Sequence, residues 1–557
     1  MPLGVGFFMR EQASQGPPIV QADRLQRMII DQAKLMPPIR TQPRPVLCHQ
    51  PMLSASRAFL QLLLILALLP TSAAAEMESS LRNHIANADL RGTQVSICVM
   101  DIGERLLLTE IHDDREMIPA SNMKLVTSAA ALHTLGKDFT FTTKLKLLSN
   151  KEAPAGDGFP ALVVQGDGDP AFGSPNVLED AGYNVDQMLG WWLDAVEKTG
   201  FDQFGQLIID DRIFKSGSSQ RVHPTWPKNQ LHKWYCAQVM GVNFFDNCFR
   251  INASPTRTGQ DARVTVYPYG PFVKTEMRLR TGRADQWDII TSPDSNRLTF
   301  RGTIRNRQQQ DVAMHDPAMV FGEMLKHELA KRKITVGEVV RPAEDQRLPD
   351  GKVLHKLNTT LQAVLNRVNQ DSQNMYAEAI LKRSGHAITG APGTFENGAA
   401  AVREYLASRI KDPTLAAQIK LADGSGLSRD NRVSARALVE VLRVQATSQD
   451  FRPFIASMAT PNNRDSINKR FTEDDKPLLI GDLYCKTGTI NHVSALSGYL
   501  VYPDAGPNET ARVLAFSILV NGHGLGQARN ISGAAVRRLQ DELVKIMDEE
   551  AVGALSP

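Results

Sequence analysis

Cysteine is scarce in this chain of 557 residues, which contains only five. Cys48 lies near the N-terminus, and the other four are Cys98, Cys236, Cys248 and Cys485. So few cysteines exclude a disulfide-stabilised scaffold, and the absence of a C-x-x-C pair argues against zinc or redox chemistry. Cys236 and Cys248 are close enough in sequence to form a disulfide in an oxidising compartment, and two buried free thiols are an equally weighted alternative.

Long apolar runs and metal-ligand spacings are also missing. Outside the N-terminal region no segment approaches 18 consecutive apolar residues, which argues against a membrane-spanning helix there. The twelve histidines include neither H-E-x-x-H nor another ligand spacing, so we expect no metal site and no cofactor. With 42% hydrophobic and 22% charged residues, the composition is that of a folded globular protein.

The one long apolar run covers residues 58–69, between Arg57 and a stretch of small residues that ends at Ala75. Twelve residues form about 18 Å of helix, which is short of the ~30 Å hydrocarbon core of a bilayer. This pattern is typical of a secretory signal peptide. We therefore predict a leader over residues 1–75 that contains a signal peptide cleaved near Ala75, and a periplasmic or exported mature chain. Because the signal counted from Met52 to Ala75 has a normal size of 24 residues, we expect translation to start at Met52. An uncleaved leader that keeps the chain at the membrane surface is the alternative.

The small positive net charge belongs to this leader. The chain carries +3 in total, and its first 75 residues contain seven Lys or Arg and three Asp or Glu, a net +4 that leaves −1 for the rest. The remainder also lacks a basic cluster. We therefore expect no nucleic-acid partner.

Strand patterns occur at both ends of the chain after the leader. Alternating apolar residues predict strands over 94–100, 105–111, 482–487, 494–502 and 512–520. Helices are predicted over 76–91, from Pro119 to Leu135, and over 529–549. Together these elements predict an antiparallel sheet that is built from both ends of the chain and flanked by helices, which is an α+β fold.

The middle of the chain has a different sequence pattern. Short β-like runs at 140–148, 161–165, 206–209, 263–267 and 297–304 alternate with Gly, Pro, Asp and Ser turns. Two helical patterns lie at 185–198 and 317–332, and helical periods return over 353–470. We interpret residues 140–349 as inserted β-rich domains that interrupt one catalytic domain, formed by 76–139 and 350–557.

Three short motifs follow one another in the chain: Ser121-Asn-Met-Lys124, Ser372-Gln-Asn374 and Lys486-Thr-Gly488. Each is weak alone, but their settings agree with one chemistry. Ser121 and Lys124 are three residues apart at the start of a predicted helix and so share a face. Lys486 lies on a predicted strand, whose backbone can pair with an extended substrate. The order and settings match the motif set of penicillin-interacting serine enzymes.

The motif residues can be assigned chemical roles. The Ser121 hydroxyl becomes a nucleophile only when a base takes its proton, and Lys124 is the available base. Neutral lysine near pH 7 requires the pKa to fall about three units from ~10.4, or roughly 4 kcal/mol, which burial and the nearby ammonium of Lys486 could supply. Ser372 would relay the proton to the leaving amine, and Asn374 would hold a substrate amide.

The third motif is predicted to bind the substrate. Lys486, Thr487, Gly488 and Thr489 form one strand, whose side chains and backbone would hold a substrate carboxylate. The backbone N–H groups of Ser121 and Thr489 would form an oxyanion hole, in which one donor is typically worth ~3–4 kcal/mol.

With these three motifs the chain resembles a known family. It is similar to the low-molecular-mass penicillin-binding proteins of class C, serine D-alanyl-D-alanine carboxypeptidase/endopeptidases with a large insertion between the first two motifs. The spacings agree, with 251 residues from Ser121 to Ser372 and 114 from Ser372 to Lys486. Further stretches that resemble the family are 166–170, 207–211, 247–249 and 422–429.

The resemblance implies a fold, a substrate and an inhibitor class. The fold would be a penicillin-binding/β-lactamase-like domain, with an antiparallel sheet flanked by helices and nested insert domains. Peptidoglycan muropeptides would acylate Ser121 through their penultimate D-Ala, and β-lactams would acylate it covalently. One departure is Gln373, where many members carry Asp, and that side chain has no role in the mechanism above.

Other residues keep two interpretations. In the family an acidic residue of the insert favours substrates with a free amine. Asp211 or Asp210 is our candidate for it, with a turn-capping aspartate as the alternative. The segment Asp423-Gly-Ser-Gly-Leu-Ser428 lacks G-x-S-x-G spacing, so we interpret it as a glycine-rich loop that borders the site. For the whole chain, the alternative functions are a β-lactamase or esterase on the same fold and a non-catalytic peptidoglycan-binding relative.

Overall fold

The computed structural model describes residues 74–88, 90–292, 294–461, 467, 470–473, 476–503 and 512–553. All but the last two residues of the predicted leader therefore lie outside the described residues. In the part that is described, no helix combines the length and the apolar character needed to cross a membrane.

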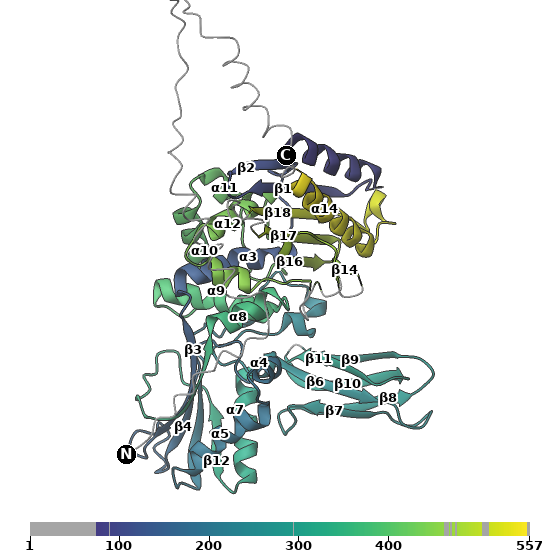
Figure 1. Cartoon of the computed structure of the whole chain (residues 1–557). Coiled ribbons are helices and arrows are strands. Elements are labelled where there is room, and N and C mark those ends of the chain that lie inside the picture. The colour runs from purple at the N-terminus through teal and green to yellow at the C-terminus, as the bar shows by residue number, and fades with distance from the viewer. Residues whose placement is uncertain are drawn as a thin grey trace, which may run out of the picture. The chain divides into compact units, whose positions relative to one another are not determined.

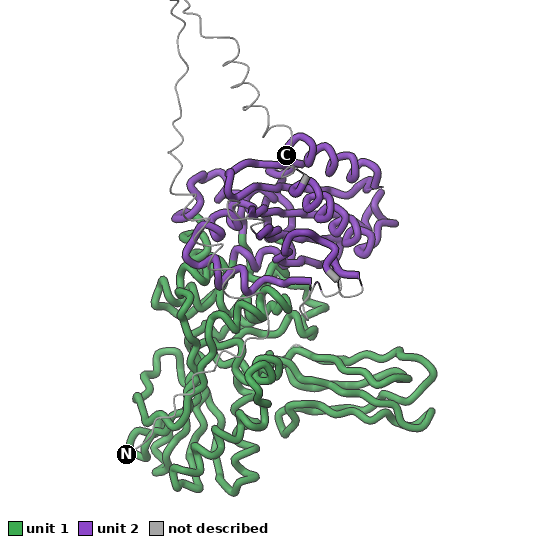
Figure 2. The backbone as a smooth tube through the Cα atoms, viewed as in Figure 1, with its two compact units in different colours: residues 1–15, 127–406, 421–430 green, residues 16–126, 407–420, 431–557 purple. Residues whose placement is uncertain are grey.

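The chain divides into two compact units (Figure 2). Unit 1 contains the described residues of 127–406 and 421–430. Unit 2 contains those of 16–126, 407–420 and 431–557, so both ends of the described chain belong to it.

Unit 2 contains one five-stranded antiparallel sheet (Figure 1). Its strands, in spatial order, are β16 (Asp482–Ile490), β17 (Val493–Tyr502), β18 (Arg512–Asn521), β1 (Gln94–Asp101) and β2 (Leu106–Ile111). β1 and β18 join the two ends of the chain, with Gln94 opposite Asn521. The predicted sheet of two N-terminal and three C-terminal strands is confirmed.

Helices cover both faces of this sheet, which explains why all ten residues of β17 are buried. A helix over residues 74–87 and α14 (Gly533–Gly553) share one apolar core with the strands. α12 (Ala435–Ala446) contacts β1, β17 and β18. The shorter elements of unit 2 are the 3-10 turns η1 (Ala120–Asn122) and η5 (Gly526–Ala528), the helices α11 (Pro413–Ala417) and α13 (Phe451–Ala456), and the strands β14 (Thr472–Glu473) and β15 (Lys476–Pro477).

Unit 1 contains a mixed five-stranded sheet. In spatial order its strands are β12 (Thr335–Val340), β5 (Gln203–Asp210), β4 (Ala161–Gln165), β3 (Thr140–Leu148) and β13 (Lys352–Thr360). β5 is parallel to both of its neighbours, whereas β3 is antiparallel to β4 and β13. The helices α5 (Val185–Glu197) and α7 (Pro317–Lys331) contribute to its core, together with the buried Trp192. The helical pattern expected from residue 353 is wrong over 352–360, because β13 pairs with β3 there.

Two three-stranded sheets form an elongated β-structure in the same unit (Figure 1). One has the order β11 (Gln308–Ala313), β6 (Cys248–Ser254), β7 (Arg263–Tyr267). The other has the order β8 (Lys274–Thr281), β10 (Ser295–Ile304), β9 (Gln286–Ser292). The predicted runs 263–267 and 297–304 lie in β7 and β10.

The rest of unit 1 is mainly helical. The helices that begin in it are α4 (Pro175–Asp180), α6 (Ser218–Arg221), α8 (Leu361–Asn369), α9 (Asn374–Thr389) and α10 (Phe395–Arg409). Its 3-10 turns are η2 (Lys228–Gln230), η3 (Trp234–Cys236) and η4 (Phe245–Asn247). α9 ends at Gly390, whose φ of 68° gives the left-handed cap that glycine adopts without strain.

Candidate active site

Ser121 lies in the turn η1, which leads into α3 (Met123–Leu135). The predicted helix therefore starts at Met123, two residues after the serine. Ala120 has a φ of 46°, in the left-handed region that residues with a Cβ rarely occupy. Such backbone positions cost about 1–3 kcal/mol and cluster at functional sites. The turn thus holds Ser121 next to a strained residue at the head of a helix.

Lys124 lies next to this serine. Its Nζ donates a hydrogen bond of 2.9 Å to Ser121 Oγ. Lys124 is fully buried, whereas Ser121 is partly exposed. The first motif therefore places an amine within the reach that a general base requires of its proton donor.

Asn122 joins the serine turn to the strand of the third motif. Its Nδ2 donates to the backbone O of Lys486 over 2.8 Å, and its Oδ1 accepts from Ser497 Oγ over 2.6 Å. Ser497 Oγ also lies 2.9 Å from Ser517 Oγ. This fully buried asparagine was not singled out from the sequence. The only sign of its role in the sequence is that it is a polar residue between Ser121 and Lys124. Its hydrogen-bond partners are more than 360 residues away along the chain.

Gly488 allows the same strand to approach the turn. A Cβ at this position would lie 2.8 Å from Pro119 O and 3.1 Å from Ser121 N. A side chain would therefore push β16 and η1 apart. Lys486 is buried and its Nζ donates to Thr487 O over 3.1 Å, while Thr489 is exposed. In unit 2 the structure thus brings the first and third motifs together.

Ser372 and Asn374 belong to unit 1. Ser372 has a φ of 60°, and Asn374 is the first residue of α9. The Asn374 side chain is buried, and its Nδ2 donates to Tyr235 O over 2.8 Å. The second motif therefore also combines a left-handed residue, here the serine itself, with the start of a helix.

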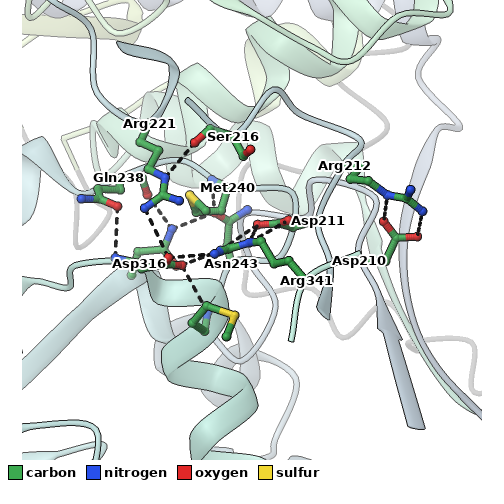
Figure 3. A network of polar contacts seen from close by, with 12 residues as sticks. Asp210, Asp211, Arg212, Ser216, Arg221, Gln238, Met240, Asn243, Asp316 and Arg341 are labelled. Carbon is green, nitrogen blue, oxygen red and sulfur yellow. Dashed lines mark hydrogen bonds and ion pairs between the residues drawn. The ribbon is translucent and has the colours of Figure 1, made fainter. Parts of the chain in front are cut away.

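Asp211 lies in a buried ion-pair network (Figure 3). Arg341 Nε lies 3.1 Å from both carboxylate oxygens of Asp211, and Arg341 Nη1 donates to Asp316 over 2.8 Å. Burial raises the pKa of Asp211, and the charge of Arg341 opposes that shift. Asp210 is held separately by Arg212 Nε over 2.7 Å.

Both carboxylates are thus engaged by arginines of the same unit, and Asp211 is only 1% exposed. The expected role of Asp211 in binding a substrate amine stays a prediction. The partner of Asp211 is 130 residues further along the chain, whereas the partner of Asp210 is only two residues away.

All four cysteines of the described chain are buried, and none of them forms a disulfide there. Cys236 and Cys248 are therefore not paired, which favours the free-thiol alternative. Burial raises the pKa of Cys98 and of Cys236 to about 12, so neither is suited to act as a thiolate nucleophile near neutral pH. Within the described ranges, no group of three or more His, Cys, Asp or Glu residues could hold a metal ion.

The family of this chain is identified by comparison with known proteins. The model of the D-Ala-D-Ala carboxypeptidase 3 (S13) family matches residues 77–542. The chain belongs to this family. It is a serine peptidase of the D-alanyl-D-alanine carboxypeptidase type, as the sequence predicts.

Individual relatives agree with the family. A D-alanyl-D-alanine carboxypeptidase of an Actinomadura species is 28% identical over 484 residues, which cover 83% of this chain and 82% of the relative. The D-alanyl-D-alanine carboxypeptidase DacB of Haemophilus influenzae is 24% identical over 470 residues, or 82% and 92% of the two chains.

The solved structures agree on the fold. The crystal structure of penicillin binding protein 4 (dacB) from H. influenzae superposes with a TM-score of 0.66 at 21% identity, covering 84% of this chain and 98% of that one. The predicted penicillin-binding fold is therefore confirmed.

Proposed function

We propose that this carboxypeptidase removes the terminal D-alanine from peptidoglycan stem peptides through an acyl-enzyme on Ser121. The observation that carries the proposal is the 2.9 Å hydrogen bond between Lys124 Nζ and Ser121 Oγ, in a turn held against the Lys486 strand by Asn122. This arrangement has a nucleophile, a base within reach and a strand beside them, which acyl transfer requires.

The reaction would run in two halves. Ser121 Oγ attacks the carbonyl carbon of the penultimate D-Ala and gives its proton to Lys124. The C–N bond then breaks, the proton passes to the leaving amine, and D-alanine departs. Water next attacks the Ser121 ester, which releases the shortened peptide acid and restores the hydroxyl. The Ser121 N–H, on the side where Gly488 approaches, is a candidate oxyanion donor.

The roles of the second motif are assigned from the chemistry of its side chains. Ser372 would relay the proton towards the leaving amine, and Asn374 would hold a substrate amide. Supporting these roles are the left-handed backbone at Ser372 and the position of Asn374 at the head of α9. Lys486, Thr487 and Thr489 would hold the terminal carboxylate.

The same serine nucleophile would account for two further reactions. A crystal structure of the H. influenzae penicillin binding protein 4 contains a β-lactam, and it superposes with a TM-score of 0.62. We propose that β-lactams acylate Ser121 here as well. A D-Ala amide in a peptide cross-link differs from the stem peptide only in its leaving amine, so D,D-endopeptidase activity would use the same steps.

The substrate requires the protein to work outside the cytoplasm. We propose that residues 1–75 direct export and that cleavage near Ala75 leaves the enzyme in the periplasm. The support is the apolar run after Arg57 followed by small residues. An N-terminus near residue 76 in protein recovered from the periplasmic fraction would agree with this, and a protein that keeps residues 52–75 would contradict it.

Fluorescent penicillin labelling tests the nucleophile. The wild-type protein should carry the label after denaturing electrophoresis, and Ser121→Ala should carry none, because the ester forms on that oxygen. Ser292→Ala, which changes an exposed serine of the inserted strands, is the control and should label normally. Labelling of Ser121→Ala would contradict the assignment, and release of the label within seconds would favour the β-lactamase alternative.

A further inference from the structure

One face of α9 carries three polar residues, and the mechanism above uses only the first of them, Asn374. Asn374, Glu378 and Lys382 follow one another at intervals of four, so they lie on one side of the helix. Glu378 and Lys382 are both fully buried. Buried charged side chains are costly unless they are paired or hydrogen-bonded, so their partners are informative.

The partners of this face include the segment of residues 214–236. Lys382 Nζ donates to the backbone O of Gln220, and Asn374 Nδ2 donates to the backbone O of Tyr235 over 2.8 Å. The segment therefore runs along α9 from its second half back to its first residue. Its start is fixed as well, since Lys215 N donates to Gly393 O over 3.0 Å.

The glycine-rich loop 422–428 completes the arrangement. Glu378 accepts from the backbone N–H groups of Gly424 and Ser425, over 2.8 and 2.9 Å. The loop lies so close to α9 that a Cβ on Gly424 would lie 2.9 Å from Ala377 O.

The loop also binds the segment directly. Asp423 accepts from Trp226 Nε1 over 2.7 Å, and Trp226 is only 2% exposed. Thr225 Oγ1 and Ser428 Oγ share a hydrogen bond of 2.6 Å. Helix, segment and loop thus form a closed set of contacts within unit 1, and the candidate residue Asn374 is part of it.

The surroundings of Lys382 show how specific its contact is. Nζ lies 4.2 Å from the centroid of the Phe395 ring, a cation–π distance. Burial lowers the pKa of Lys382 to about 7, and the charges of Glu378 and Glu396 oppose that shift. Burying this amine costs desolvation free energy, which a lysine that makes a hydrogen bond at the surface does not lose.

We propose that Lys382 is a positioning residue for Asn374. By binding Gln220 O, Lys382 fixes the 214–236 segment on α9, and the fixed segment holds the Tyr235 carbonyl that orients the Asn374 amide. The inference rests on the proposed function, because it assumes that Asn374 holds a substrate amide.

The variant Lys382→Met tests this, because it keeps most of the aliphatic stem and removes the donor. It should lower kcat/KM for D-Ala release from a pentapeptide muropeptide about 10- to 100-fold, as small misplacements of a substrate-positioning group do. Arg383→Met is the matched control. It removes the neighbouring ion pair of α9 with Asp167, which is 3.0 Å long and does not involve the 214–236 segment, and it should leave kcat/KM within twofold of wild type.

A double-mutant cycle separates positioning from general destabilisation. If Lys382 acts through Asn374, the substitution should have no further effect in an Asn374→Ala background. Full additivity of the two losses, or wild-type kcat/KM in folded Lys382→Met, would overturn the inference. Wild-type activity of Asn374→Ala alone would instead refute the proposed role of Asn374.

A milder variant covers the case in which Lys382→Met does not fold. Trp226→Phe keeps an aromatic side chain of smaller size and removes the Nε1 donor to Asp423. It should lower kcat/KM about 3- to 10-fold, and this loss should also vanish in the Asn374→Ala background. A loss of the same size in that background would overturn the inference.

Discussion

At the scale of the residue, Gly488 is constrained by what lies beside it. The space for a side chain is already occupied by Pro119 O and Ser121 N. The glycine of the third motif thus has a steric role that follows from the approach of β16 to the serine turn.

The variant Gly488→Ala tests this steric role. The added methyl group should displace η1 or β16 by a few tenths of an ångström and lower the rate of penicillin acylation about 10- to 100-fold. Gly190→Ala is the control, because nothing lies within 4 Å of its Cβ position in α5. It should acylate normally and gain up to about 1 kcal/mol in stability from helix propensity. A wild-type acylation rate in folded Gly488→Ala would show that the approach is not needed.

The sequence predicted the reactive residues better than the residues that hold them. Ser121 and Lys124 are three residues apart, so helical geometry alone brings them together. The partners of Asn122 are strand residues at the other end of the chain, and Asp211 meets Arg341 after 130 residues. Such contacts depend on tertiary structure, so no local pattern predicts them.

At the scale of the element, α9 joins the second motif to the loop 422–428 through Glu378. Burial, together with the negative charge of Asp423, raises the pKa of Glu378 to about 8. The other charged groups near this cluster are Lys382, Glu396, Asp430 and His223. Two carboxyl groups in one buried site favour the protonated form of one of them.

This shift predicts a pH-dependent stability. The folded state holds the Glu378 proton more tightly than the unfolded state, whose pKa is near 4.5. The stabilisation is therefore fully present below about pH 4.5 and is lost as the pH rises through 8. Between pH 5 and pH 8 the unfolding free energy of the wild type should decrease more than that of Glu378→Gln. The difference between the two decreases should exceed about 1.4 kcal/mol, which corresponds to one pKa unit.

Chemical denaturation at pH 5, 6, 7 and 8 measures this effect. Glu404→Gln is the control, since Glu404 is exposed on the neighbouring α10 and should leave the profile of the wild type unchanged. Parallel profiles for wild type and Glu378→Gln would contradict the prediction.

Elements were predictable where most of their residues are apolar and buried. The strands β1, β17 and β18 lie between layers of helices, so their apolar residues mark them clearly. β13 was missed because it is an edge strand in which only Thr359 is buried, which leaves no alternating pattern in the sequence. The turn η1 was predicted as helix, because its departure from helix depends on the left-handed Ala120.

At the scale of the whole molecule, the cysteines give a redox prediction. Cys98, Cys236, Cys248 and Cys485 are buried, and none of them forms a disulfide among the described residues. The chain without its leader, denatured and alkylated without a reductant, should therefore take up four alkyl groups by mass spectrometry, and prior reduction should change nothing. Uptake of two groups, rising to four after reduction, would show that a disulfide forms in the exported protein.

The central claim is that the chain is a carboxypeptidase that works through an acyl-enzyme on Ser121. Mass spectrometry of pentapeptide muropeptides, incubated with the purified protein, tests it most directly. The wild-type protein should convert the pentapeptide to a tetrapeptide and free D-alanine, and Ser121→Ala should leave it intact. Equal release of D-alanine by Ser121→Ala would contradict the account. So would no release by unlabelled, folded wild-type protein whose parallel sample is labelled by penicillin.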